Sequence, residues 1–111
     1  MKEIKKLVTE ISGRRGKECY FILCCAVEAA LLNQPNEPPM KYICAAVRER
    51  TEKKSDRAVS KALSRAVDDI WENGDRKRLE QIYARPILEK PAPRDMVLVL
   101  AQYLWKSPVE V

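Results

Sequence analysis

Residues 55–74, SDRAVSKALSRAVDDIWENG, carry the clearest helical pattern in this chain of 111 residues. Apolar residues recur along it at spacings of three and four, which predicts a helix with one face packed on a core. These residues are Val59, Leu63, Ala66, Val67 and Ile70. Ser55 or Asp56 is suited to cap the first turn, and Gly74 is a residue type that commonly ends a helix in the left-handed conformation. We therefore expect this helix to run to about Asn73.

The opposite face of this helix is polar and mostly basic. It carries Arg57, Ser60, Lys61, Ser64 and Arg65, with Asp68 lower down. Residues 40–50 predict a shorter preceding helix, and residues 51–54 form a short polar connection. From residue 48 to residue 65 the chain has seven positive and three negative residues, a local excess of +4. A helix pair joined in this way predicts a helix-turn-helix at about residues 40–73.

Helical spacing of apolar residues recurs through the rest of the chain, and no segment alternates with the period of two expected of a strand. We expect further helices at about residues 4–11, 17–33, 75–83 and 94–106, separated by loops rich in proline or glycine. In the helix at 17–33 the residues expected to face the core are Tyr20, Leu23, Cys24, Val27 and Leu31, with Phe21 and Cys25 beside them. In the last helix they are Val97, Leu98, Ala101, Leu104 and Trp105. The sequence thus predicts one all-α domain of six helices over residues 1–111.

Composition argues against catalysis and against a bound cofactor. The chain has no histidine, so no Cys–His or Ser–His pair is available, and its three glycines form no phosphate-binding loop. Its four cysteines lack the C-x-x-C spacing of a zinc site, so we expect reduced, small core residues and no metal. We therefore expect no enzyme activity and no cofactor.

Charge and hydropathy indicate where the protein works and what it binds. No apolar run approaches the ~20 residues of a membrane span, and no apolar stretch follows the N-terminus as in a signal peptide. A soluble, cytoplasmic protein with no membrane partner is expected. Lys and Arg number 21 against 16 Asp and Glu, and the resulting net charge of +5 suits a polyanion.

Double-stranded DNA is the polyanion that this pattern favours. A helix about 10–12 Å across fits the major groove, where its exposed side chains meet base edges. The candidate base-contacting residues are Arg57, Ser60, Lys61, Ser64 and Arg65, and the candidate phosphate-contacting residues are Arg50, Lys53 and Lys54. A charged helix face opposite an apolar stripe is also what an ordinary solvated helix presents. Periodicity and charge alone leave both interpretations open.

Landmark residues along almost the whole chain, from about residue 4 to residue 105, resemble a known family. They are Glu10-Ile11, Tyr20, Leu23, Ala26 and Val27, then Val59, Ala62, Leu63, Ala66 and Val67, then Trp71-x-x-Gly74, and last Lys90-Pro91 followed by an apolar helix near Met96. In this order they resemble the C-terminal DNA-binding effector domain of stage zero sporulation protein A. That family consists of response regulators that start sporulation.

The resemblance implies a six-helix fold and a transcription regulator that binds tandem operator elements as a homodimer or a larger array. It also implies a contact with an RNA polymerase sigma factor after the recognition helix, for which Arg76, Lys77 and Arg78 are the candidates. Phosphate binding and an ordinary solvated face are the alternatives for these three residues, and the solvated face is the interpretation that the charged run by itself favours.

The chain departs from the family in two respects. Ala58, Ser60 and Lys61 stand where the family carries an arginine, a glutamate and a second arginine, and Arg65 stands for a histidine. No receiver domain precedes the effector-like part, which predicts either a stand-alone regulator or a fragment. The alternative function is a protein-interaction module, which modulates a full-length regulator or contacts RNA polymerase without binding DNA.

Overall fold

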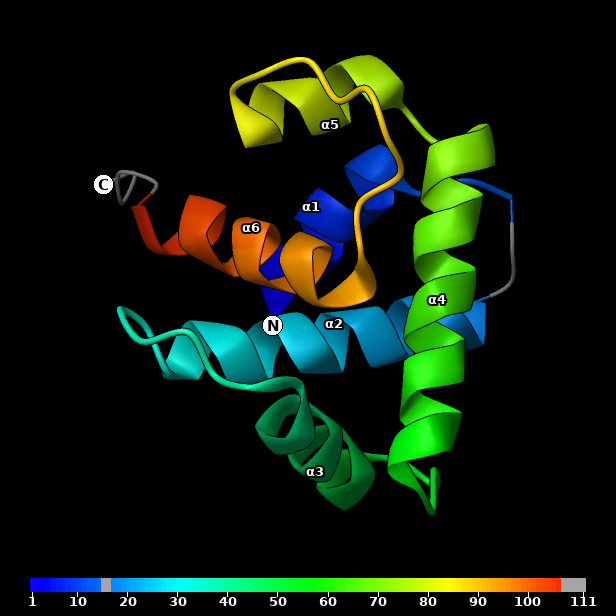
Figure 1. Ribbon diagram of the computed structural model, residues 1–111, viewed down its shortest axis with the longest axis vertical. Coiled ribbons are helices and arrows are strands. Elements are labelled where there is room, and N and C mark those ends of the chain that lie inside the picture. The colour runs from blue at the N-terminus through cyan, green and yellow to red at the C-terminus, as the bar shows by residue number, and fades with distance from the viewer. Residues whose placement is uncertain (15–16, 107–111) are drawn as a thin grey trace.

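The computed structural model describes residues 1–14 and 17–106. Over these ranges the protein contains six helices and no strand, as the sequence predicted. The helices are α1 (Lys2–Ile11), α2 (Lys17–Leu32), α3 (Met40–Arg50), α4 (Asp56–Asn73), α5 (Arg76–Tyr83) and α6 (Pro93–Lys106). Figure 1 shows α4 standing across one end of α2, with α3 beside the start of α4 and α5 beyond its end.

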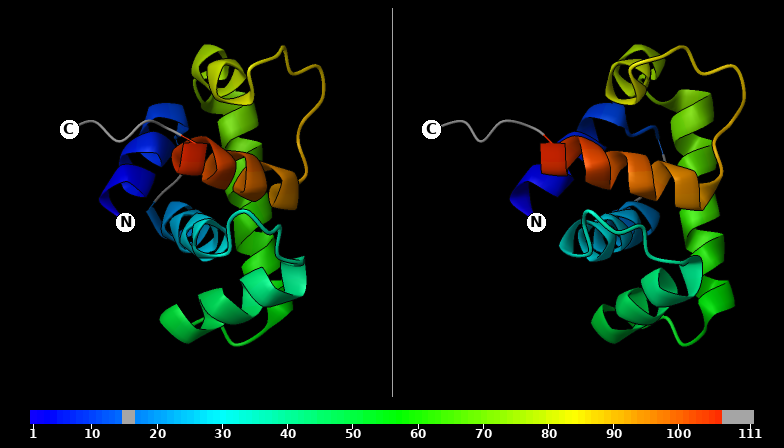
Figure 2. Two further views of the ribbon diagram at one scale, coloured as in Figure 1. Left: turned by 90° about the vertical axis from the view of Figure 1, so that its left-hand side faces the viewer. Right: turned by 60° about the vertical axis from the view of Figure 1, so that its left-hand side comes forward.

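Helix α2 is the centre of the fold, and it contacts α1, α3, α4 and α6. Neighbours therefore cover it on several sides, as the two views of Figure 2 also show. The expected buried stripe on α2 is incomplete for this reason, although Leu23, Cys24 and Val27 are buried as expected, with Cys25 beside them. Ile22 and Ala26, which the stripe omitted, are fully buried, whereas Phe21 is 45% exposed. Tyr20 and Leu31 are only partly buried and pack at the edge of the core.

Helix α4 follows its sequence pattern closely. All five residues of the predicted apolar stripe are buried, so the opposite face is the one that meets solvent. The Ser55 side chain caps the first turn by accepting a hydrogen bond from Ala58 N at 3.1 Å. The helix ends at Gly74, but the expected left-handed conformation there is wrong, since φ is −86°. A Cβ atom on Gly74 would instead collide with the backbone oxygens of Ile11 and Ile70.

A buried polar cluster fixes α4 against α2 and against the end of α1. Asp69 is 2% exposed and sits among the apolar residues of α4. It accepts hydrogen bonds from the Tyr20 hydroxyl at 2.5 Å and from Asn73 Nδ2 at 2.9 Å. The Tyr20 hydroxyl in turn accepts one from Gly13 N at 2.8 Å. A buried carboxylate is tolerable when donors surround it in this way, so the cluster sets the position of α4.

The remaining core agrees with the sequence in part. Ile43, Cys44 and Val47 of α3 are buried, and all four cysteines are buried and reduced. In α6, Met96 and Leu100 are fully buried, while Trp105, expected in the core, is 49% exposed because it lies in the last turn. In the parts of the chain that the structure describes, no helix is long and apolar enough to cross a membrane.

Candidate nucleic-acid interface

The connection between α3 and α4 is short and held by local hydrogen bonds. Thr51 ends α3, and its hydroxyl donates to the Val47 carbonyl at 2.9 Å. The same hydroxyl accepts a hydrogen bond from Lys53 N at 3.2 Å. Ser55, which caps α4, follows Thr51 by four residues. These bonds fix the angle between the two helices, so residues that flank the turn have defined positions.

The exposed face of α4 carries a row of three cations, which we name the α4 stripe: Arg57, Lys61 and Arg65. Successive members are four residues apart, so they lie on one side of the helix over about 12 Å. All three are exposed, and within residues 1–14 and 17–106 no ion pair involves them. Ser64 lies beside the stripe and is also exposed.

Ser60 is less exposed than the sequence suggested. It is partly buried, and its hydroxyl is 3.8 Å from the Cys44 sulfur on α3. The residue therefore lies at the packed boundary between α3 and α4. Of the five predicted base-contacting residues, the four exposed ones are Arg57, Lys61, Ser64 and Arg65.

The predicted phosphate-contacting residues are less available than their charge suggested. Arg50 pairs with Glu28 of α2, and Lys53 donates to Glu18 Oε1 of α2 at 2.5 Å. Arg48 pairs with Asp56 at 3.1 Å. Only Lys54 of the three predicted phosphate contacts is without an ion pair among the described residues. The local excess of +4 overstates the open charge, because α2 brings two carboxylates to this region.

Glu18 and Glu28 are the neighbours of the predicted phosphate contacts that the sequence did not reveal. Glu18 is 35 residues from Lys53 along the chain, so no local pattern connects the two. The hydrogen bond and the positive charge of Lys53 hold the pKa of Glu18 below its usual value. The carboxylate is therefore ionised wherever the surrounding pH is near neutral.

The part of α4 after Arg65 carries no cationic residue. Asp68 lies there and accepts a hydrogen bond from Lys90 Nζ at 2.6 Å, which raises the pKa of Lys90. Glu72 follows one turn later and is exposed. The exposed cations of α4 therefore lie between Arg57 and Arg65, next to the preceding turn.

The run Arg76–Arg78, expected to offer three cations to a polymerase, offers mainly one. The Arg76 guanidinium lies 3.4 Å from the centre of the Trp71 ring and donates to the Trp71 carbonyl at 2.7 Å. Arg78 donates to Glu10 Oε1 at 2.8 Å, and this bond raises its pKa. Both arginines are thus used to hold α5 in place. Lys77 is the exposed member of the run.

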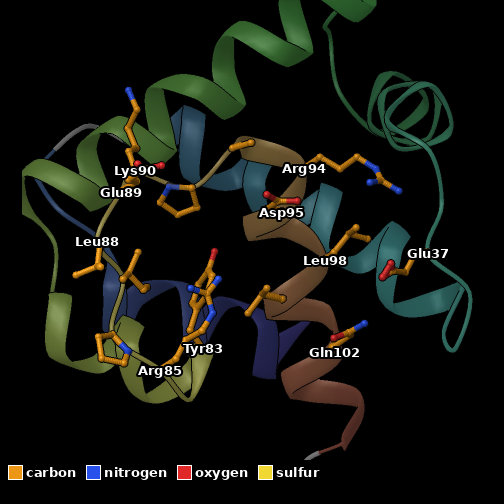
Figure 3. Close-up of a pocket in the computed structure, with 15 residues that line it drawn as sticks. Glu37, Tyr83, Arg85, Leu88, Glu89, Lys90, Arg94, Asp95, Leu98 and Gln102 are labelled. Carbon is orange, nitrogen blue, oxygen red and sulfur yellow. The ribbon is translucent and has the colours of Figure 1, made fainter.

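A second surface feature is a cavity of about 690 Å³ along α6 and the connection from α5. Figure 3 shows the Tyr83 hydroxyl directed into it, and this buried oxygen has no hydrogen-bond partner among the described residues. Burial and the nearby charge of Asp95 raise the pKa of Tyr83 to about 12, so the hydroxyl stays neutral. Three cationic and three anionic side chains line the cavity, namely Arg85, Lys90, Arg94, Glu37, Glu89 and Asp95. This balance gives no preference for a polyanion, and none of the predicted DNA contacts lies there.

In the described ranges no cluster of cysteine, aspartate or glutamate is arranged to hold a metal ion. No protein-family model matches the chain, and no curated protein and no solved structure is significantly similar to it. The resemblance to the sporulation effector domain therefore stays a prediction from the landmark residues.

Proposed function

We propose that this protein is a sequence-specific DNA-binding transcription regulator that places the first half of α4 in the major groove. The observation that carries the proposal is the α4 stripe, three exposed cations that form no ion pair within residues 1–14 and 17–106, on the open face of a helix whose other face is buried in the core. Helices α3 and α4 would then act as a helix-turn-helix. No catalytic step and no cofactor belong to this function.

The dimensions and chemistry of the stripe support this proposal. The stripe spans about 12 Å, which is comparable to the width of the major groove. Arg57, Lys61 and Arg65 carry donors suited to guanine O6 and N7, and the Ser64 hydroxyl can bond several base edges. Lys54 lies in the turn just before α4. A contact from it to a phosphate would fix the register of α4 on the DNA without reading bases.

The resemblance to the sporulation effector domain supports the rest of the proposal. We propose that the protein acts in the cytoplasm, binds tandem sites as a homodimer, and contacts an RNA polymerase sigma factor through a surface that includes Lys77. Its base preference would differ from that of the family, because Ala58 and the partly buried Ser60 occupy two base-reading positions.

The test is a titration of duplex DNA of random and of selected sequence, followed by fluorescence anisotropy over a series of KCl concentrations. We expect affinity to fall steeply with salt, because bound cations displace condensed counterions. Lys61→Ala should cost about 1–3 kcal/mol at the selected site and relax the preference there. Lys77→Ala is the matched control, since it removes one exposed cation outside α4 and should leave the preference unchanged.

A protein-interaction module is the second candidate. The exposure of Lys77 favours it, since this residue lies in the segment that the resemblance assigns to a polymerase contact. No binding to any duplex at low salt, or a flat response to salt, would leave this function in place of DNA binding.

A further inference from the structure

A carboxylate of the protein itself lies within the proposed DNA interface. Glu18, in the first turn of α2, accepts a hydrogen bond from Lys53 Nζ at 2.5 Å. Lys53 belongs to the turn between α3 and α4, beside the open Lys54. The Glu18 side chain is 76% exposed, so the pair is formed at the surface and faces solvent.

Glu18 also interacts electrostatically with one member of the α4 stripe, Arg65. After the larger contribution of Lys53, the positive charge of Arg65 also lowers the pKa of Glu18. The carboxylate therefore interacts with a predicted phosphate contact and with a predicted base contact at once. A DNA backbone that approaches Lys53 must therefore approach Glu18 as well.

The chemistry of the pair is that of a phosphate contact. An ammonium group donates to an anionic oxygen in both cases, and such charge-assisted bonds are short and directional. In the free protein the Glu18 oxygen takes one of the three donors of the Lys53 ammonium group and partly neutralises the charge that would attract a DNA phosphate. The bound carboxylate also adds a negative charge that repels the phosphate.

The other pair between α2 and this region behaves differently. Glu28, the partner of Arg50, is only 20% exposed, and it also lies 3.9 Å from the N-terminal ammonium group. Arg50 is thus held by a carboxylate that is largely shielded from solvent. In the Glu18–Lys53 pair the carboxylate is 76% exposed and the Lys53 side chain is 26% exposed, and a pair with a solvent-exposed carboxylate contributes little net free energy and opens readily. Lys53 is therefore the cation whose availability a small change can alter.

We propose that Glu18 is an internal mimic of a DNA phosphate, which engages Lys53 in the free protein and limits the affinity of α4 for duplex DNA. The inference rests on the proposed function and adds to it the residue that sets the strength of non-specific binding. Replacing Glu18 by Gln frees Lys53 for the DNA backbone and removes the repulsion.

The experiment compares the full chain with Glu18→Gln in anisotropy titrations of a labelled random-sequence duplex over a KCl series. We expect Glu18→Gln to bind about fivefold to tenfold more tightly at low salt, with a slope of log affinity against log salt about 0.9 steeper, because one more phosphate is contacted. In the double variant Glu18→Gln, Lys53→Ala, the added slope should disappear. Circular dichroism melting of each variant checks that it is folded.

Glu3→Gln is the matched control. Glu3 is exposed and lies in the first turn of α1. Glu3→Gln therefore changes the net charge as Glu18→Gln does, and it likewise removes a carboxylate from the first turn of a helix. An equal gain in affinity for Glu3→Gln and Glu18→Gln would overturn the proposal, as would an unchanged Glu18→Gln beside a wild type that binds. If neither the wild type nor Glu18→Gln binds duplex at the lowest salt, the proposed function itself fails. Binding by Glu18→Gln alone would support both proposals.

Discussion

Replacing Tyr20 with Phe tests the polar cluster that positions α4. The change removes only the hydroxyl, which donates to Asp69 Oδ2 at 2.5 Å and accepts from Gly13 N at 2.8 Å. A hydrogen bond to a charged group contributes about 1.5–3 kcal/mol and a neutral one about 0.5–1.5 kcal/mol. We therefore expect Tyr20→Phe to lower the free energy of unfolding by about 2–4 kcal/mol, a large part of the total stability of a small domain.

Urea denaturation followed by circular dichroism at neutral pH measures this difference. Burial and the bond to Asp69 raise the pKa of Tyr20, so the phenol is a neutral donor throughout the assay. Tyr42→Phe is the matched control, because Tyr42 is 47% exposed and its loss of a hydroxyl should change stability very little. A loss below about 0.5 kcal/mol for Tyr20→Phe, which is the range of ordinary surface substitutions, would refute the role given to the cluster.

Three further predictions concern packing, thiol chemistry and the position of α5. Gly74→Ala should destabilise the protein by about 1–3 kcal/mol in the same denaturation assay, since its Cβ would meet backbone oxygens of α1 and α4; an unchanged midpoint would contradict this packing. Burial raises the pKa of Cys24 to about 11, so stability linked to this thiol is complete below about pH 9 and is lost as pH rises toward 11. Iodoacetamide should therefore label Cys24 at mildly alkaline pH only when urea is present, and rapid labelling of the native protein would show that the thiol is accessible. Arg78→Met should lose the link to Glu10 at a cost of about 1 kcal/mol in urea denaturation while DNA affinity stays the same; a fall in DNA affinity would instead place Arg78 in the interface.

Local sequence patterns predicted the helices well because each helix carries its own signals. The apolar face of α4 and the Ser55 cap each depend on residues within a few positions of one another, and the structure confirms both. The apolar stripe assigned to α2 was incomplete, because burial on several sides depends on which helices pack around it. Periodicity along one helix contains no information about that arrangement.

The candidate interface was predictable only as far as local charge describes it. The exposure of Lys61 and Arg65 follows from their place opposite the apolar stripe. The pairing of Lys53 with Glu18, 35 residues away, depends on how α2 crosses the turn and was not visible in the sequence. Asp69 was overlooked for a similar reason, since one of its donors, Tyr20, lies on α2, far from it along the chain. The position of Asp69 three residues after Ala66 and next to Ile70 was nevertheless a local signal that this carboxylate could be buried.

Nitrogen-15 NMR of the labelled protein during titration with a short duplex tests the central claim most directly, since each backbone amide reports its own surroundings. Our account predicts that the shifted amide signals at low salt cluster at residues 54–65 and at Glu18, and that they return to their free positions as KCl is added. Signals that do not shift at low salt, or shifts confined to α5 and the lining of the cavity along α6, would contradict the assignment of α4 as the DNA-binding element.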